Sequence, residues 1–242
     1  MLLRERLVVA LDVPSAGRAK DLAGRLAGRV GLFKVGLELF YAAGPAVVPE
    51  ITAAGGTGVF LDLKLHDIPN TVAGAVRSLV PLAPAILNVH AAGGLAMMRA
   101  AREAAGDEAA RLGVAPPRLI AVTVLTALDD EGFRQAGFTG TIVDTVLQLA
   151  YLAAKAGLDG VVASAGEAGV LRREMGPDFL IITPGIRPEG ASPGDQRRLF
   201  TPAAAVKAGA SHLVVGRPVT GAQDPVRAVQ DILDEMAKAV GS

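Results

Sequence analysis

The chain has 242 residues, of which 51% are hydrophobic, and its 24 lysines and arginines balance 24 aspartates and glutamates. Zero net charge excludes a general attraction to nucleic acid or to an anionic membrane. The lack of cysteine excludes disulfides, thiolate nucleophiles and cysteine-bound metals. No apolar run approaches the roughly 18 residues of a membrane span, and the first residues lack the pattern of a secretory leader. We expect a soluble cytoplasmic protein.

Short β-type segments alternate with amphipathic helical segments along the chain. The strands are expected at residues 7–11, 32–35, 58–63, 85–89, 119–124, 160–163, 179–182 and 212–215. Helical patterns fill most of the intervals, for example at 15–27, 45–54, 95–112, 142–156 and 225–240. Such alternation favours a parallel sheet. Eight units in this length favour a closed (β/α)₈ TIM barrel, a single α/β domain over residues 1–242, rather than an open doubly wound sheet.

Charged residues and glycines collect at or just beyond the ends of these strands. They are Asp12, Lys34, Asp62, Lys64, His90, Thr126, Gly185, Gly216 and Arg217. Active sites of (β/α)₈ barrels lie at the carboxyl ends of the strands. The sequence therefore predicts an active site at that end of the barrel.

The strongest signal is the pair Asp62 and Lys64 in the otherwise apolar third strand, followed by Asp67. Residues two apart in a strand share a face, and charges in a buried strand are rare unless they are paired or functional. A structural ion-pair cluster is the alternative. Lys34 ends the neighbouring strand, so we expect an alternating array of Lys34, Asp62, Lys64 and Asp67. At an effective dielectric of 20, two unit charges 4 Å apart interact by about 4 kcal/mol. This array would hold Lys64 protonated as a positioned acid, without a metal.

Two glycine- and proline-rich segments near the C-terminus suggest a phosphate site. Gly216 and Arg217 follow the eighth strand, and Arg187 and Gln196 flank a long loop after the seventh strand. In barrels these two loops frequently bind phosphate, and a guanidinium group suits phosphate oxygens. A simple turn and a surface insertion are the alternatives. The pairing of both segments on adjacent strands favours phosphate binding with a lid.

The remaining polar candidates are less specific. His66, His90 and His212 are scattered without the spacing of metal ligands, so structural roles are favoured, although His90 ends the fourth strand and could line the site. Asp12 is equally compatible with a helix cap near Ser15 and with a ligand for sugar hydroxyls. No dinucleotide-binding fingerprint or P-loop occurs.

Taken together, these segments resemble the orotidine 5′-phosphate decarboxylase family in its bacterial form. The resemblance runs along nearly the whole chain, from VVALD at 8–12 through FLDLKLHDIPNT at 60–71 to VGRP at 215–218. The run D-x-K-x-H-D-I-P-N-T, which begins at Asp62, is highly specific. The resemblance implies decarboxylation of orotidine 5′-phosphate to uridine 5′-phosphate and CO₂, the last step of de novo UMP biosynthesis. Neither a metal nor another cofactor is implied.

The resemblance also implies roles for individual residues. Lys64 would donate a proton to C6 of the substrate, within the charged array of Lys34, Asp62, Lys64 and Asp67. The protein would be a homodimer, with Asp67 and Thr71 reaching into the partner's site. Asp12 would bind the ribose of the substrate, and Thr126 would lie against the pyrimidine. The phosphate would be bound by Arg187, Gln196, Gly216 and Arg217. Further contacts with the substrate would come from Lys34, Asp62 and Thr71.

Two other functions remain open. A magnesium-dependent sugar-phosphate decarboxylase or aldolase of the same superfamily also uses D-x-K-x-x-D, but such enzymes place a glutamate for Mg²⁺ where this chain has Lys34. An ammonium group at that position should repel the metal. The chain could also be a non-catalytic phosphate-binding barrel that kept the fold, although no catalytic residue of the family pattern is missing.

Overall fold

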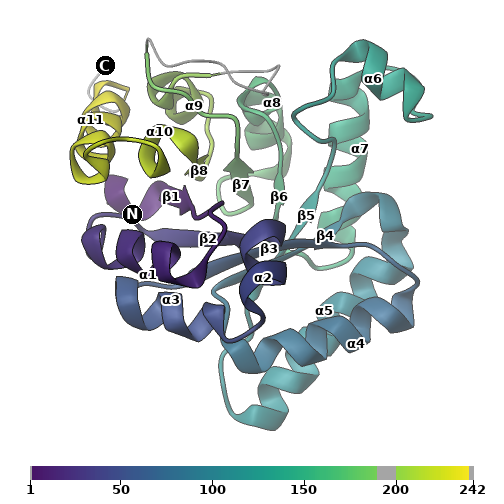
Figure 1. Cartoon of the computed structure of the whole chain (residues 1–242). Helices are drawn as coiled ribbons and strands as arrows, with labels where there is room; N and C mark the ends of the chain where they lie inside the picture. The colour runs from purple at the N-terminus through teal and green to yellow at the C-terminus, as the bar shows by residue number, and fades with distance from the viewer. Residues whose placement is uncertain (1, 190–199, 240–242) are drawn as a thin grey trace.

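The computed structural model describes residues 2–189 and 200–239. Its centre is a closed barrel of eight parallel strands in which each strand pairs with the next and β8 pairs with β1 (Figure 1). The strands are β1 (Leu7–Ala10), β2 (Leu32–Gly36), β3 (Val59–Leu65), β4 (Ile86–His90), β5 (Arg118–Val122), β6 (Gly160–Val162), β7 (Leu180–Thr183) and β8 (His212–Val215). The predicted (β/α)₈ barrel is confirmed.

Alternate residues of the strands point to opposite sides of the barrel wall. Val8 and Ala10 of β1, with Phe60 of β3 and Val214 of β8, belong to a small apolar cluster inside the barrel. Their neighbours in sequence, such as Val9, belong to the larger core that lies between the strands and the helices. Because both faces are covered, the strands read as nearly continuous apolar runs.

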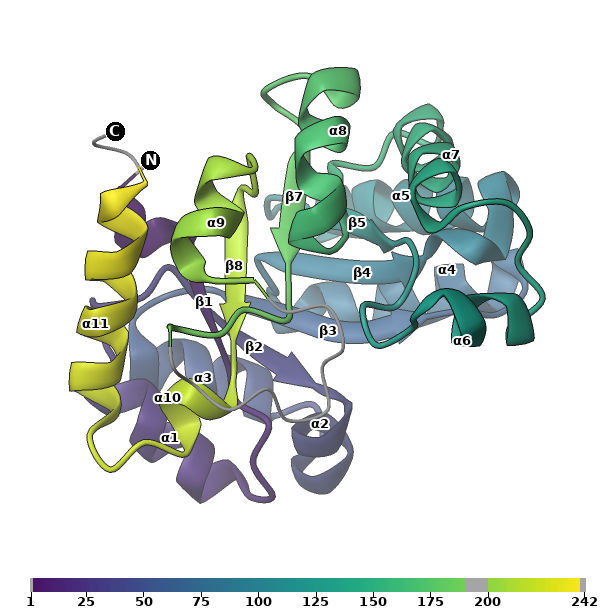
Figure 2. The same cartoon turned by 90° about the horizontal axis from the view of Figure 1, so that it is seen from above.

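Helices surround the strands, as the view from above shows (Figure 2). They are α1 (Ala16–Arg25), α2 (Leu37–Ala43), α3 (Val47–Gly55), α4 (Pro69–Leu79), α5 (Gly94–Leu112), α6 (Asp130–Gln135), α7 (Ile142–Lys155), α8 (Ala165–Met175), α9 (Pro202–Lys207), α10 (Arg217–Thr220) and α11 (Pro225–Lys238). Short 3₁₀ turns lie at Leu3–Arg6, Val80–Leu82 and Ala91–Gly93. In the described part of the chain, no helix is both long and apolar enough to cross a membrane.

Side-chain caps fix the first turns of several helices. These first turns lie on the side of the barrel where the strands end, because each helix runs back along the wall. The side chains of Ser15, Thr141, Ser164 and Asp224 accept hydrogen bonds from the first turns of α1, α7, α8 and α11. Such caps satisfy backbone N–H groups that have no partner within the helix. The α11 helix contacts α1, which completes the outer ring.

Candidate active site

A cavity of about 550 Å³ opens at the carboxyl ends of the strands. Apolar residues from the strands form one part of its wall: Ala10, Phe60, Val122, Val162 and Val214. Of the predicted site residues, those that line it are Asp12, Lys34, Asp62, Lys64, Thr126, Arg187, Gly216 and Arg217. Asp67 and Thr71 are not among the described residues that line it. Gln196 lies outside the described residues.

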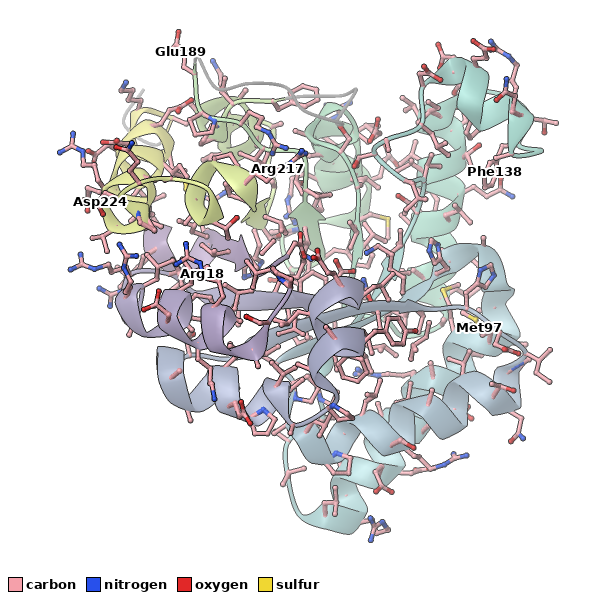
Figure 3. The ribbon with its side chains drawn as sticks, in the orientation of Figure 1. Arg18, Met97, Phe138, Glu189, Arg217 and Asp224 are labelled. Atoms are coloured by element: carbon pink, nitrogen blue, oxygen red, sulfur yellow. The ribbon has the colours of Figure 1, made fainter. Side chains whose placement is uncertain are left out.

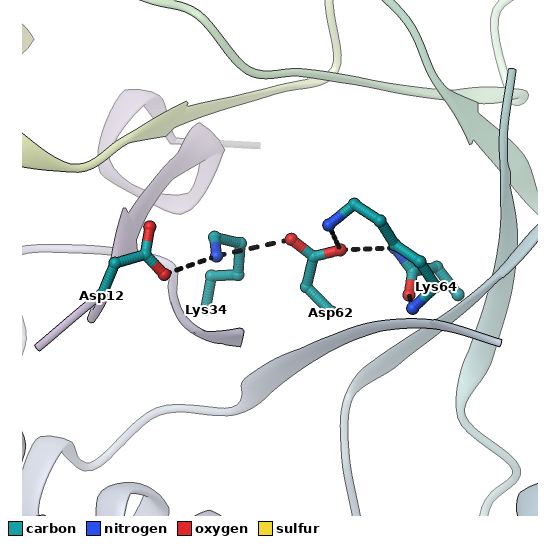
Figure 4. Close-up of polar contacts among 5 residues, drawn as sticks. Asp12, Lys34, Asp62 and Lys64 are labelled. Atoms are coloured by element: carbon teal, nitrogen blue, oxygen red, sulfur yellow. Dashed lines mark hydrogen bonds and ion pairs between the residues drawn. The ribbon is translucent and has the colours of Figure 1, made fainter. Parts of the chain in front are cut away.

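Two carboxylates and two ammonium groups alternate along the wall of this cavity (Figure 4). Asp62 Oδ1 accepts a hydrogen bond from Lys64 Nζ at 2.7 Å, and Asp62 Oδ2 lies 3.4 Å from Lys34 Nζ. Lys34 Nζ also donates to Asp12 Oδ1 at 2.9 Å. The expected meeting of Lys34, Asp62 and Lys64 therefore occurs. Within one chain, Asp12 and not Asp67 is the fourth member.

Burial and pairing act against each other on the central residues of the array. Burial by itself raises the pKa of Asp62, but the ammonium groups of Lys34 and Lys64 and two hydrogen bonds outweigh it, and the net pKa is lowered. Burial likewise lowers the pKa of Lys34, but the Asp62 and Asp12 carboxylates outweigh it, and the net pKa is raised. Both residues therefore remain charged around neutral pH. An ionised, paired array is the only arrangement in which these buried charges are tolerable.

The strand that carries Asp62 and Lys64 is not regular at this point. The pairing of β3 with β4 shifts between Leu61 and Leu65, and Lys64 adopts a left-handed backbone with φ 53°. Asn88 of β4 lies opposite: its Nδ2 donates to Asp62 Oδ1 at 2.7 Å, and its Oδ1 accepts from the Lys64 N–H at 2.8 Å. Both charged side chains reach the cavity as expected, but through a bulge.

Asp12 owes its position to Lys34 and to Gly36, the last residue of β2. Asp12 does not cap α1, because Ser15 does so by accepting a hydrogen bond from the Arg18 N–H. A Cβ on Gly36 would lie 2.8 Å from Lys34 Nζ and 3.0 Å from Asp12 Oδ1. Because Gly36 has no side chain, it leaves room for the ion pair between Asp12 and Lys34.

Two guanidinium groups lie at another part of the cavity. Arg187 follows β7, and Arg217 begins α10 directly after Gly216. Arg217 is labelled on the upper side of the barrel in the view of Figure 3. Burial and then the charge of Arg217 lower the pKa of Arg187. The Arg187 N–H donates to the Phe200 carbonyl at 3.0 Å, which joins the two ends of the loop after β7. Two like charges in one pocket are suited to an anion with several oxygens.

The segment from His66 to Thr71 leaves the barrel and is exposed throughout. Ile68 is a large apolar residue, it is 66% exposed, and it directly precedes α4. Asp67 Oδ1 accepts a hydrogen bond from the Ile68 N–H at 2.6 Å. The segment therefore presents Asp67 and Thr71 away from the cavity of its own chain.

The chain is similar to known proteins along nearly its whole length. The model of the orotidine 5′-phosphate decarboxylase / HUMPS family matches residues 5–232. The chain belongs to this family. It is 55% identical to the orotidine 5′-phosphate decarboxylase of Rhodospirillum rubrum over 94% of its length and 92% of the relative's. It is 53% identical to that of Moorella thermoacetica, over 98% and 94%.

Solved structures of the orotidine 5′-phosphate decarboxylase family share the fold. The crystal structure of the enzyme from Lactobacillus acidophilus has a TM-score of 0.82 at 38% identity and covers 95% of this chain and 98% of its own. That from Pyrococcus horikoshii has a TM-score of 0.76 at 25% identity, with 96% and 99% covered. The likeness therefore extends over the whole barrel.

In this member of the decarboxylase family, the histidines do not form a metal site. Among residues 2–189 and 200–239, no group of three or more His, Asp or Glu side chains is placed to hold a metal ion. The rings of His66 and His90 lie 5.3 Å apart beside the site, whereas His212 begins β8 at the opposite end of the barrel. Burial, followed by the charges of His66 and Lys64, lowers the pKa of His90.

Sequence reasoning missed three residues that this family member places at or behind the cavity. Asn88 contacts the charged array, Gly36 makes room for it, and Glu38 at the start of α2 lines the cavity. Only Asn88 left a usable signal, because a polar side chain in an apolar strand needs a buried partner. Its partners could not be named from the sequence.

Proposed function

We propose that this chain decarboxylates orotidine 5′-phosphate to uridine 5′-phosphate and CO₂, as the last step of de novo UMP synthesis in the cytoplasm. The observation that carries the proposal is the alternating Asp12–Lys34–Asp62–Lys64 array in a cavity that also holds Arg187 and Arg217. Family membership and the printed names of the relatives support the same substrate.

We propose one orientation for the three parts of this substrate in the cavity. Arg187, Arg217 and the backbone at Gly216 bind the phosphate, with Gln196 as a further proposed contact. Asp12 and Lys34 bind the ribose hydroxyls. The pyrimidine lies between Thr126, which is buried, and the apolar wall formed by the strands. This orientation puts C6 and its carboxylate beside Asp62 and Lys64.

The chemistry needs a charge and a proton at one carbon atom. The bond between C6 and the carboxylate breaks, CO₂ leaves, and the electron pair stays on C6. The Lys64 ammonium stabilises this developing charge and then transfers a proton from Nζ to C6. Asp62, held ionised, faces the substrate carboxylate, and the phosphate contacts supply binding energy remote from the reacting bond. No electron acceptor takes part.

We further propose a homodimer with shared sites. Asp67 and Thr71 lie outside the cavity of their own chain on an exposed segment that also carries Ile68. This segment is exposed and carries polar and apolar side chains together, so it is accessible to contact by a second subunit. In the dimer, Asp67 extends the partner's array next to Lys64, which completes the alternation of four charges predicted from the sequence.

A magnesium-dependent reaction is the main alternative, and a single assay separates the two. Lys34 Nζ lies between Asp12 and Asp62, at 2.9 Å and 3.4 Å from their oxygens, where a divalent ion would have to displace it. We therefore expect orotidine 5′-phosphate consumption, followed by ultraviolet absorbance, to proceed at the same rate with and without excess chelator. A strict Mg²⁺ requirement would contradict the proposal. Tight binding of UMP analogues without turnover would instead indicate a non-catalytic barrel.

A further inference from the structure

We propose that Asn88 is the positioning residue of this site, and that it holds the Asp62 carboxylate and the Lys64 backbone in the geometry that proton delivery requires. The inference rests on the proposed function. Asn88 is fully buried and is not among the residues that line the cavity. It therefore acts through Asp62 and Lys64 rather than on the substrate.

The register of the barrel explains why a positioning residue is needed here. Leu61 pairs with Leu87 and Leu65 pairs with Val89, so β3 advances four residues while β4 advances two. The extra length bulges out at Asp62, Leu63 and Lys64. Bulges next to active sites re-aim a side chain, at the loss of ladder hydrogen bonds.

The left-handed backbone of Lys64 is the strained point of this bulge. A non-glycine residue with φ 53° occupies a sparsely populated region, which persists only when its surroundings hold it. The Lys64 N–H has lost its regular strand partner and donates to Asn88 Oδ1 at 2.8 Å instead. Asn88 thus replaces the missing ladder contact.

The same amide also fixes the central carboxylate. Asn88 Nδ2 donates to Asp62 Oδ1 at 2.7 Å, and Lys64 Nζ donates to the same oxygen at 2.7 Å. A reversed amide would set its NH₂ against the Lys64 N–H and its oxygen against the carboxylate, so only one orientation fits. Aspartate in place of Asn88 would lack the donor, and an apolar residue would lack both groups. Asparagine is therefore specified by the chemistry of its two partners.

Steady-state kinetics of two variants test this role. Asn88→Ala removes both hydrogen bonds, whereas Asn88→Asp keeps the size and can still accept from the Lys64 N–H. We expect kcat to fall about 10- to 100-fold in both, because a small misplacement of a catalytic group has effects of that order. KM should change by less than about threefold, because the phosphate contacts are remote from Asn88. Ile86→Ala, which opens space in the same strand inside the barrel without touching the array, is the matched control.

The pH profiles add a signature that loss of packing alone would not produce. Without the Asn88 donor, the pKa of Asp62 rises. As the pH is lowered, Asn88→Ala should therefore lose activity at a higher pH than the wild type does. In Asn88→Asp the second carboxylate donates only when protonated, so activity relative to the wild type falls as the pH rises. An unchanged kcat and profile in both variants, or the same shifts in Ile86→Ala, would overturn the inference.

A measurement that needs no turnover separates this inference from the proposed function. The ¹³C resonance of the Asp62 carboxyl, assigned by its loss in Asp62→Asn, should titrate at a higher pH in Asn88→Ala than in the wild type. If the wild type lacks decarboxylase activity but this titration shifts, the function fails and the positioning role stands. If the wild type is active and neither the titration nor kcat responds to either variant, the positioning role fails alone. If Asn88→Ala does not fold, Asn88→Asp decides by its kcat and profile.

Discussion

The charged side chain of Lys64 is held in a defined position at the cavity. Its ammonium is bound to Asp62 at 2.7 Å, and its side chain is 30% exposed, so it is open to the cavity while remaining paired. A free lysine side chain would sample many conformations, whereas this one is already oriented before a ligand arrives. Preorganised charge of this kind needs little rearrangement in the transition state.

Replacing Lys64 with alanine should abolish measurable decarboxylation while the protein remains folded. We expect kcat/KM to fall by at least about 10²- to 10⁴-fold, the contribution typical of a positioned acid, because both the charge and the proton at C6 are lost. The ultraviolet assay measures the rate, and circular dichroism reports the fold. Lys20→Ala is the matched control, since it removes only a surface ion pair with Glu50. Retained activity in Lys64→Ala would exclude Lys64 as the proton donor.

His212 makes stability depend on pH at the far end of the barrel. Burial, with the charges of Arg6 and Arg118, lowers its pKa from 6.5 to about 4, and its Nδ1 has no hydrogen-bond partner among the described residues. Between these two pH values the unfolded chain binds a proton that the folded chain does not. The free energy of unfolding should therefore decrease as the pH falls from 6.5 to 4, by about 3 kcal/mol from this residue.

Urea unfolding at a series of pH values measures this contribution. In His212→Gln the decrease between pH 6.5 and 4 should be smaller than in the wild type by about that amount. The decarboxylation rate near neutral pH serves as the control and should not change, because His212 lies at the opposite end of β8 from the cavity. Equal slopes in the two proteins would show that His212 titrates normally in the folded state.

At the scale of the elements, most of the barrel could be predicted because its strands are short apolar runs bounded by polar residues. The eighth strand, expected at 212–215, forms at His212–Val215. The bulge in β3 could not be predicted. Asp62-Leu63-Lys64-Leu65 alternates like a regular strand, and nothing in its composition marks a left-handed lysine. The feature arises from pairing with β4, and its anchor Asn88 is 24 residues further along the chain.

The site, like the barrel, could be predicted only in part, because contacts between distant segments are not visible in the sequence. Lys34, Asp62 and Lys64 were brought together correctly because neighbouring parallel strands end at the same edge. The contact between Asp12 and Lys34 was not predicted, because Asp12 lies beyond the end of β1 and its side chain had two plausible roles. The place of Asp67 cannot be derived from one chain, since its proposed partner is a residue of another.

The spacing between β6 and β7 depends on a glycine. A Cβ on Gly160 would lie 2.2 Å from the Leu180 carbonyl oxygen and 2.7 Å from the Leu180 Cα, so the two strands would have to separate. We expect Gly160→Ala to lower the free energy of unfolding by about 1–3 kcal/mol, the usual cost of overpacking. Thermal unfolding measures the change. Gly17→Ala on α1, where a new Cβ meets no atom within 4 Å, should leave stability unchanged or raise it. Equal melting temperatures for wild type and Gly160→Ala would show that the strands adjust freely.

At the scale of the whole molecule, the barrel separates two tasks. Its core and helices hold the strands, while the carboxyl ends of the strands carry the charged residues that line the cavity. The exposed segment from His66 to Thr71 belongs to neither task within one chain. It follows β3 directly, so the same strand that places Asp62 and Lys64 in its own cavity also projects Asp67 outward. The proposed shared site would be a property of a dimer, and it requires a test in which two chains are mixed.

Complementation between two inactive variants provides that test. Lys64→Ala lacks the proton donor, and Asp67→Asn lacks the proposed contribution to the partner's array, so each should be inactive alone. In a hybrid dimer, one site combines Lys64 from the second variant with Asp67 from the first and is complete, whereas the other site lacks both. Free exchange at equal concentrations makes half of the dimers hybrid, so a two-fold dimer should recover about a quarter of wild-type activity. Each variant exchanged with itself is the control. Exchange is verified by native mass spectrometry with one variant isotopically labelled, and hybrids without activity would show that Asp67 acts within its own chain.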